Sequence, residues 1–353
     1  MLYGVLILAL VYVSLQTALA PLLILLSAAA ISALLCVLLR PLLVRYALAR
    51  PNARSSHRVP TPQGGGIAVL AGAFLAIGLV LQGLPPLPGA DSLAFVVTVS
   101  VVLAVVGAWD DIRPLSAGLR LCLQALCVAV VIVYAAPNVR LFPELMPLAV
   151  ERCLALLAGM WFVNLTNFMD GIDWITIAGI VPLAGALALA GATGLIDPAS
   201  GLLAAALCGG LLGFAPFNKP TARLFLGDVG SLPIGLLSAY LLYRLAGTGA
   251  LAAALILPLY HVADATITLL RRLLRREKIW EAHRSHFYQQ ATTNGHGVLS
   301  VVTLVSLLNC ALVGLATLSI LMPATMVQLA CIAAAIALTA LVLRRFSRQA
   351  PAS

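Results

Sequence analysis

The chain has 353 residues, of which 62% are hydrophobic and 9% are charged, and its mean hydropathy is +1.07. Such a composition cannot cover a soluble domain of this size with polar surface, so soluble protein classes are excluded. The net charge of +9 comes from 21 Lys and Arg against 12 Asp and Glu. In a membrane protein this excess indicates topology and attraction to anionic lipids or phosphates, and not nucleic-acid binding.

Apolar runs recur along the whole chain, and a helix that crosses a membrane needs about 20 residues. The sequence therefore predicts an all-α, polytopic transmembrane helical bundle of about eleven spans, within a range of ten to twelve. The whole chain, 1–353, is expected to form a single integral membrane domain, since no window is polar enough for a second one. The expected spans are 21–44, 64–83, 93–109, 119–136, 148–166, 174–192, 199–216, 231–246, 249–271, 298–319 and 323–343.

The first residues form the one uncertain span. Residues 2–19 are apolar enough for a twelfth helix. They lack a basic start and a small-residue cleavage site before a soluble region, so we interpret them as a retained helix and not as a signal peptide.

The loops between the spans alternate in charge. Most Lys and Arg fall in one set of loops, at 45–63, 110–118, 167–173, 217–229 and 272–297, and in the tail after residue 343. The positive-inside rule places this set in the cytoplasm. The acidic clusters described next fall on the same side, so we expect a multi-pass protein whose site faces the cytoplasm.

Five aspartates lie beside membrane-depth segments in three short clusters. They are Asp110 and Asp111 in GAWDDIRPL, Asp170 and Asp173 in NLTNFMDGIDWIT, and Asp228 in LFLGDVGSLPIG. A charge near the bilayer costs about 2.5–3.5 kcal/mol on insertion scales, so the clusters indicate function. Carboxylate and amide oxygens suit Mg²⁺ or Mn²⁺. The pattern predicts a site that holds a divalent cation and acts on phosphates.

The spacing of the second cluster predicts a polar stripe. Asn164, Asn167, Asp170 and Asp173 follow one another at intervals of three, so a continuous helix would align them on one face. The alternative is a polar contact between helices, which explains one asparagine more easily than four aligned positions.

The other two clusters have different geometry. Asp110 and Asp111 would point about 100° apart on a helix, so that one can face a metal and the other a substrate. Around Asp228, Gly227 and Gly230 would let backbone N–H groups face a phosphate. A solvated helix end and a plain turn between helices are the respective alternatives.

The loop RRLLRREKIWEAHRSHFYQQ, residues 271–290, concentrates six Lys and Arg with His283 and His286. We expect a cationic lid that contacts a diphosphate. The alternatives are a zinc site, for which no third ligand is evident, and a basic loop that serves topology alone. Asp264, seven residues before Arg271, is either an internal partner or a site residue.

Together these segments resemble a known family. The segments PNARSSHRVPTPQGGG, GAWDDIRPL, NLTNFMDGIDWIT, FNKPTARLFLGDVGSLPIG and EAHRSHFYQ, in this order, are similar to the polyprenyl-phosphate N-acetylhexosamine-1-phosphate transferases of glycosyltransferase family 4. The resemblance runs from about residue 40 to 296. The AHRSH form and the RSSH…PTP loop are most similar to the branch that initiates bacterial O-antigen, and differ from the peptidoglycan branch, which has a run of histidines.

The resemblance implies a role for each matching residue. Asp228 would be the principal Mg²⁺ ligand, with Asp173 as a second, and Mn²⁺ could take its place. Asp110 and Asp111 would handle the lipid phosphate, with Asp110 favoured as the base or orienting group. The residues implied to contact the nucleotide-sugar are Asn167, Asp170, Asp173, Phe225 (stacking on uracil), His283, Arg284 and His286. Two departures from the family pattern are Trp174, where many relatives have glycine, and Gln63, where a basic residue is common.

The resemblance also implies an activity and its partners. The expected reaction transfers an N-acetylhexosamine 1-phosphate from a UDP-sugar to undecaprenyl phosphate in the bacterial inner membrane and releases UMP. GlcNAc, GalNAc and 6-deoxy sugars such as FucNAc or QuiNAc remain open, as does a homodimer. The partners are the UDP-N-acetylhexosamine, undecaprenyl phosphate and membrane lipid, without nucleic acid. A cation-coupled secondary transporter is the alternative function, and it should place its acids near the middle of the spans.

Overall fold

The computed structural model describes residues 2–49, 60–278 and 283–350, with the side chains of the first helix described from residue 19 onward. Part of the predicted 45–63 loop, including the RSSH segment, and part of the 272–297 loop lie outside the described residues. The helices are α1 Leu2–Tyr46, α2 Gly65–Leu81, α3 Ala90–Ile112, α4 Ala117–Val130 with a π-helical turn η1 Val131–Ala135, α5 Leu148–Phe168, α6 Ile175–Ala192, α7 Pro198–Phe214, α8 Asp228–Ala246, α9 Leu251–Ile256, α10 Leu259–Leu274, α11 Phe287–Thr293, α12 Val298–Leu321 and α13 Thr325–Phe346. A two-stranded antiparallel pair, β1 Leu48–Ala49 and β2 Thr61–Pro62, joins α1 to α2.

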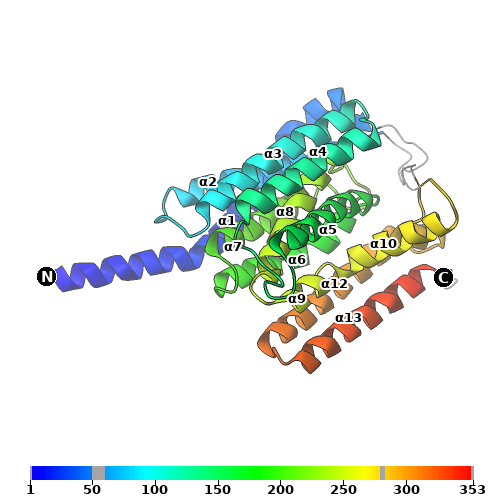
Figure 1. The fold of residues 1–353 in the computed structure, drawn as a ribbon. Helices are drawn as coiled ribbons and strands as arrows, with labels where there is room; N and C mark the ends of the chain where they lie inside the picture. Colours follow the sequence, from blue (N-terminus) through cyan, green and yellow to red (C-terminus); the bar gives the residue numbers. More distant parts are fainter. Residues whose placement is uncertain (1, 50–59, 279–282, 351–353) are drawn as a thin grey trace.

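The predicted all-α membrane bundle is confirmed. Among the described residues, eight helices are long and apolar enough to cross a membrane, and α2 and α7 are apolar but slightly shorter. Figure 1 shows α2, α3 and α4 along one side of the bundle and α12 and α13 along the other, with α5 to α8 between them. Of the eight long helices, α8 is the most enclosed, since 83% of its apolar window is buried.

Two predicted spans differ from the structure. The expected span 249–271 is broken into α9 and α10, and Pro258 lies at the break because a proline lacks the N–H that a continuous helix requires. Residues 2–19 form no separate span but are continuous with α1, which runs for 45 residues with Pro21 and Pro41 inside it. Figure 1 shows the N-terminal part of α1 extending beyond the bundle.

Small residues bring the central helices close together. A Cβ at Gly209 or Gly213 of α7 would lie 2.2 Å from a backbone oxygen of α1, and Ser32 of α1 donates to the carbonyl of Gly210 at 2.8 Å. Such small-residue faces allow membrane helices to pack by direct backbone contact, since the hydrophobic effect offers little there. Helices α1 and α7 are therefore closely packed against each other.

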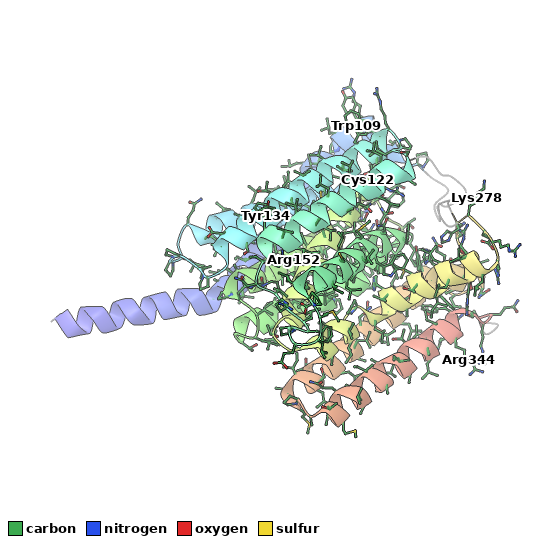
Figure 2. The ribbon with its side chains drawn as sticks, viewed as in Figure 1. Trp109, Cys122, Tyr134, Arg152, Lys278 and Arg344 are labelled. Atoms are coloured by element: carbon green, nitrogen blue, oxygen red, sulfur yellow. The ribbon has the colours of Figure 1, made fainter. Side chains whose placement is uncertain are left out.

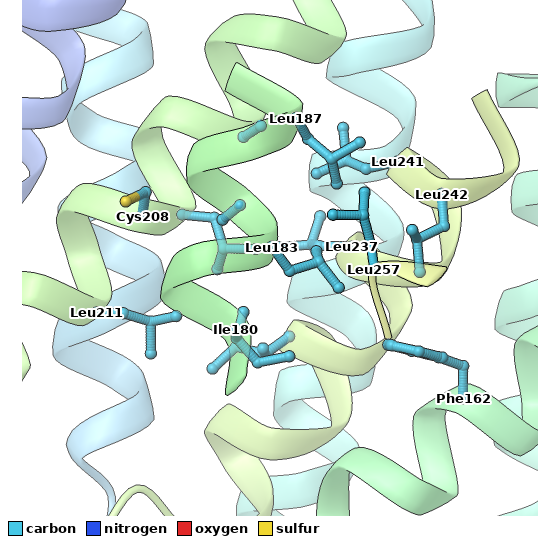
Figure 3. Packing of buried hydrophobic residues seen from close by; sticks show 14 of the residues in the cluster. Phe162, Ile180, Leu183, Leu187, Cys208, Leu211, Leu237, Leu241, Leu242 and Leu257 are labelled. Carbon is cyan, nitrogen blue, oxygen red and sulfur yellow. The ribbon is translucent and has the colours of Figure 1, made fainter. Parts of the chain in front are cut away.

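The core between α6 and α8 is built from aliphatic side chains. Ile180, Leu183 and Leu187 of α6 lie beside Leu237 and Leu241 of α8, and each is at most 2% exposed (Figure 3). This packing holds one side of α8. The position of its first residue, Asp228, is thus determined by the bundle.

In Figure 2, Trp109, Lys278 and Arg344 lie toward one end of the bundle, whereas Tyr134 and Arg152 lie toward the other. Trp109 and Tyr134 are 57% and 64% exposed, as expected for aromatic residues at the two membrane interfaces. Asp110 and Asp111 directly follow Trp109 in α3, so these two carboxylates lie at the end that carries Lys278 and Arg344.

The close approach of α2 to α8 can be tested at one glycine. A Cβ on Gly66 would lie 2.2 Å from Cα and 2.4 Å from N of Gly230, and backbone atoms cannot move aside. We expect Gly66→Ala to cost about 1–3 kcal/mol, as overpacking usually does, and to lower the melting temperature of the detergent-purified protein. Gly78→Ala in the same helix is the matched control, because its Cβ would meet no atom within 4 Å. Equal melting temperatures for the two variants would contradict the packing.

Candidate active site

The last turn of α3 holds the first turn of α8. Asp111 accepts hydrogen bonds from the backbone N–H groups of Asp228 and Val229, each at 3.1 Å. These N–H groups have no partner within their own helix, and a carboxylate there also interacts favourably with the helix dipole. Gly107 makes the approach possible, because a Cβ at this position would lie 2.3 Å from the carbonyl oxygen of Asp228.

Asp110, although adjacent, faces a different partner. Its Oδ2 lies 2.9 Å from an Arg120 guanidinium nitrogen, and its Oδ1 accepts from the backbone N–H of Leu115 at 2.6 Å. The same Arg120 nitrogen lies 3.9 Å from Oδ2 of Asp228. Arg120 was missed in the sequence analysis. Its signal was a lone cation in the first turn of an otherwise apolar span.

Asn167 joins α5 to the site. Its amide nitrogen donates to Oδ1 of Asp228 at 2.7 Å and to Oγ of Ser231 at 2.9 Å. The prediction of a four-residue stripe is wrong, because α5 ends at Phe168 and the chain then turns. Asn164, one turn deeper in the bundle, donates to Gln124 of α4 instead.

Asp170 and Asp173 lie in the turn between α5 and α6. Thr176 donates to Oδ1 of Asp170 at 2.5 Å, and the backbone N–H of Ala222 donates to Oδ2 of Asp173 at 3.0 Å. Burial, and then the negative charges of Asp228, Asp111 and Asp173, raise the pKa of Asp170 to about 8. Asp170 therefore belongs electrostatically to the same cluster, although it is placed by a turn and not by a helix.

The two departures from the family pattern take up structural contacts. Trp174 has a left-handed backbone conformation, with φ of 64°, which explains why glycine is common there. Its indole N–H donates to the carbonyl of Ala215 at 2.7 Å, and its backbone N–H donates to Asn218 at 2.8 Å. Gln63 donates to the carbonyl of Asp111 at 3.1 Å, which places it beside the cluster.

Phe225 is held at the edge of the site by hydrogen bonds of its backbone. Its N–H donates to Pro62 and its carbonyl accepts from Gly65, each at 2.8 Å, and the residue is half-buried. The segment before α8 is thereby joined to the segment before α2.

The described end of the basic loop packs against the end of α5. The His286 ring stacks on Phe168 and His283, with centroids 6.1 Å and 4.8 Å apart. Tyr288 donates its hydroxyl to the carbonyl of Phe168 at 2.8 Å. His286 is buried, His283 is half-buried and Arg284 is exposed. The loop thus brings its histidines to the end of the bundle that carries the aspartates.

The cluster is rich in negative charge. Among the ion pairs of the described residues, the Arg120 guanidinium lies 2.9 Å and 3.9 Å from two of the five carboxylates, those of Asp110 and Asp228. Hard oxygen donors with excess negative charge fit a Mg²⁺ ion. Within the described ranges, however, no three His, Cys, Asp or Glu side chains converge into a complete coordination set.

The position of Asp170 predicts how stability depends on pH. Because the fold raises its pKa from 3.8 to about 8, the folded state loses stability as pH rises through this range. In EDTA, Asp170→Asn should therefore have a higher melting temperature than the wild type, and the difference should grow between about pH 5 and pH 8. A difference that stays constant or shrinks over this interval would contradict the placement of Asp170 among the other carboxylates.

The region that holds the five aspartates is similar in sequence to known proteins. The family model of Glycosyl transferase family 4 matches residues 93–246, which include all five aspartates. A probable undecaprenyl-phosphate N-acetylglucosaminyl 1-phosphate transferase of Bacillus subtilis is 27% identical over 75% of this chain and 76% of the relative. A decaprenyl-phosphate N-acetylglucosaminephosphotransferase of Mycobacterium leprae is 26% identical over 74% of each chain. A phospho-N-acetylmuramoyl-pentapeptide-transferase of Synechococcus is 34% identical over 58% of this chain and 63% of the relative. The motifs, the membrane bundle and these matches make the chain similar to the proteins of glycosyl transferase family 4, whose family model covers less than half of its length.

Proposed function

We propose that the protein is a polyprenyl-phosphate sugar-1-phosphate transferase that acts on undecaprenyl phosphate and a UDP-N-acetylhexosamine. The observation that carries this proposal is the gathering of carboxylates at one end of a membrane bundle. Asp110 and Asp228 lie beside Arg120, and the charge of Asp228 acts on Asp170. A membrane-embedded lipid phosphate and a soluble nucleotide-sugar can meet at such an end. The named activities of the relatives support the same class of reaction.

In the proposed reaction, an oxygen of the lipid phosphate attacks the β-phosphorus of the UDP-sugar. The new bond gives the lipid-linked sugar diphosphate, and the bond from the β-phosphorus to the bridging oxygen breaks, so that UMP leaves. Phosphoryl transfer of this kind depends mainly on positioning and on neutralisation of charge. Arg120 would contribute positive charge beside the reacting phosphates, and the basic loop with His283, Arg284 and His286 would hold the diphosphate.

The hydrogen bonds suggest different roles for the paired aspartates. Both oxygens of Asp111 accept N–H groups from the start of α8, so we assign Asp111 to holding Asp228 in place. Asp110 contacts Arg120 and lies near Asp228, and we assign it to orienting the lipid phosphate or accepting its proton. Asn167 fixes one oxygen of Asp228 and leaves the other toward Arg120.

Asp228 and Asp173 would hold Mg²⁺, or Mn²⁺ in its place. When bound, the ion supplies charge that stabilises a diphosphate and the departing UMP. Asn167 and Asp170 would contact the nucleotide-sugar beside it, and Phe225 would stack on the uracil.

The location of the protein and the side on which its site lies are inferred from the distribution of Lys and Arg. Arg271 and Arg272 end α10, and Arg344 and Arg345 end α13, at the end where the aspartates gather. The positive-inside rule then supports a bacterial inner-membrane protein whose site faces the cytoplasm. An O-antigen-like pathway is the biological setting that we propose from the AHRSH form of the last motif. A secondary transporter is less well supported, because the five aspartates of the cluster lie at helix ends and in a turn, and not at mid-span.

The proposed reaction requires a divalent cation. Purified protein incubated with undecaprenyl phosphate and a panel of UDP-N-acetylhexosamines should release UMP in the presence of Mg²⁺. Excess EDTA should abolish UMP release and added Mg²⁺ should restore it, because oxygen ligands dominate the site. Full turnover in EDTA would refute the metal requirement, and no UMP with any sugar would refute the proposed activity.

Asp228 is the residue on which the metal site depends most. Asp228→Asn should reduce turnover at least about tenfold, equivalent to ~1.4 kcal/mol, while the protein still inserts and purifies normally. Asp91→Asn is the matched control, because Asp91 is an exposed aspartate in the first turn of α3, at the opposite end of that helix from Asp110. Near-normal turnover of the Asp228 variant would argue against its role as a ligand.

A further inference from the structure

Asp264 is a buried carboxylate outside the acidic cluster. It lies in α10 and is 0% exposed. Its Oδ1 accepts from the backbone N–H of Phe287 at 3.0 Å and its Oδ2 from that of Tyr288 at 3.1 Å. A buried carboxylate is costly unless such bonds satisfy it. Through them Asp264 holds the start of α11, the short helix that follows the basic loop.

Asp264 also contacts a histidine of the basic loop. Its Oδ1 lies 3.2 Å from Nδ1 of His286, and the hydroxyls of Tyr260 and Thr268 complete its surroundings at 3.3 Å and 3.4 Å. An ionised carboxylate can only accept hydrogen bonds, so this contact requires the proton of the imidazole to be on Nδ1. Nε2 is then the ring nitrogen that is left as an acceptor.

The imidazole packs against the end of α5, the helix that also contributes Asn167. Its ring stacks on Phe168, which follows directly after Asn167, the residue that holds Asp228. Tyr288 ties α11 to the carbonyl of Phe168, and a Cβ at Gly171 would lie 2.2 Å from the Tyr288 hydroxyl. The glycine in the DGID turn is therefore what allows α11, and His286 with it, to reach this position.

We propose that Asp264 is a positioning residue for the transferase reaction, which makes this inference dependent on the proposed function. It fixes His286 as the Nδ1–H tautomer with its ring held against Phe168. Nε2 is thereby presented to the phosphates, where it can accept the proton of a phosphate monoester or, once protonated, donate to a diphosphate oxygen. Carboxylate partners of functional histidines commonly act in this way.

A double-mutant cycle distinguishes two roles of Asp264: positioning His286, and acting only as a structural cap that accepts the first N–H groups of α11. Asp264→Asn should lower kcat/KM about 10–100-fold, the usual cost of losing a partner that orients a functional histidine. His286→Gln keeps a donor near the position of Nε2 that needs no partner at Asp264. In the His286→Gln background, Asp264→Asn should therefore change kcat/KM by less than about twofold, since the two residues act as one unit.

The contribution of Asp264 to stability, as the cap of α11, should not depend on His286 in the way that activity does. Asp264→Asn should lower the melting temperature in both backgrounds, because asparagine keeps one acceptor oxygen and can accept from only one of the N–H groups of Phe287 and Tyr288. Tyr260→Phe is the matched control, since it removes a contact to Asp264 without touching His286, and it should leave kcat/KM unchanged within about twofold. Equal losses of kcat/KM in the two backgrounds would reduce Asp264 to a structural cap and overturn the proposal.

The tautomer of His286 can be determined without an activity measurement. In protein labelled with ¹⁵N-histidine, the His286 imidazole, assigned by its loss in His286→Gln, should carry its proton on Nδ1. A proton on Nε2 would overturn the proposal even where Asp264→Asn fails to fold. Failure of the wild type to release UMP would refute the proposed function instead, while the tautomer still tests the Asp264–His286 contact.

Discussion

The contact between Asp111 and the first N–H groups of α8 is the interaction on which the site depends. Because α8 is the most enclosed of the long helices, its position is fixed by side chains on nearly every face. Asp111 adds a polar connection from α3 at the one place where the backbone of α8 offers unpaired donors. The backbone at Asp228 is therefore held both by the packing of α8 and by Asp111. Asn167 and Arg120 then contact a carboxylate whose position is already fixed.

Most of the fold was predictable because hydropathy and length report membrane burial directly. Ten of the eleven expected spans correspond to one helix each, whereas the span 249–271 does not, since the apolar run conceals the effect of Pro258 on the backbone. The continuity of α1 through Pro21 was also missed, because the local sequence does not say whether a proline bends a helix or ends it.

The site was predictable as a set of residues but not as a set of contacts. Asn164 and Asn167 share a spacing and a residue type, yet one meets Gln124 and the other Asp228. Asp110 and Asp111 are adjacent and identical, yet one contacts a side-chain cation and the other a helix end. These differences arise from partners 10 to 118 residues away, and most of these partners lie beyond any local pattern.

The C-terminal end of the chain is attached to the same region as the histidines. The N–H of Ala350 donates to the carbonyl of Asn294, and the amide of Asn294 donates to Phe346, each at 2.8 Å. Asn294 directly follows α11, whose first turn carries the contacts to Asp264. A purification tag or fluorescent protein fused to this end would compete with these bonds close to the histidines of the basic loop. The opposite terminus extends away from the bundle, and it is the better place for a fusion or for surface attachment (Figure 1).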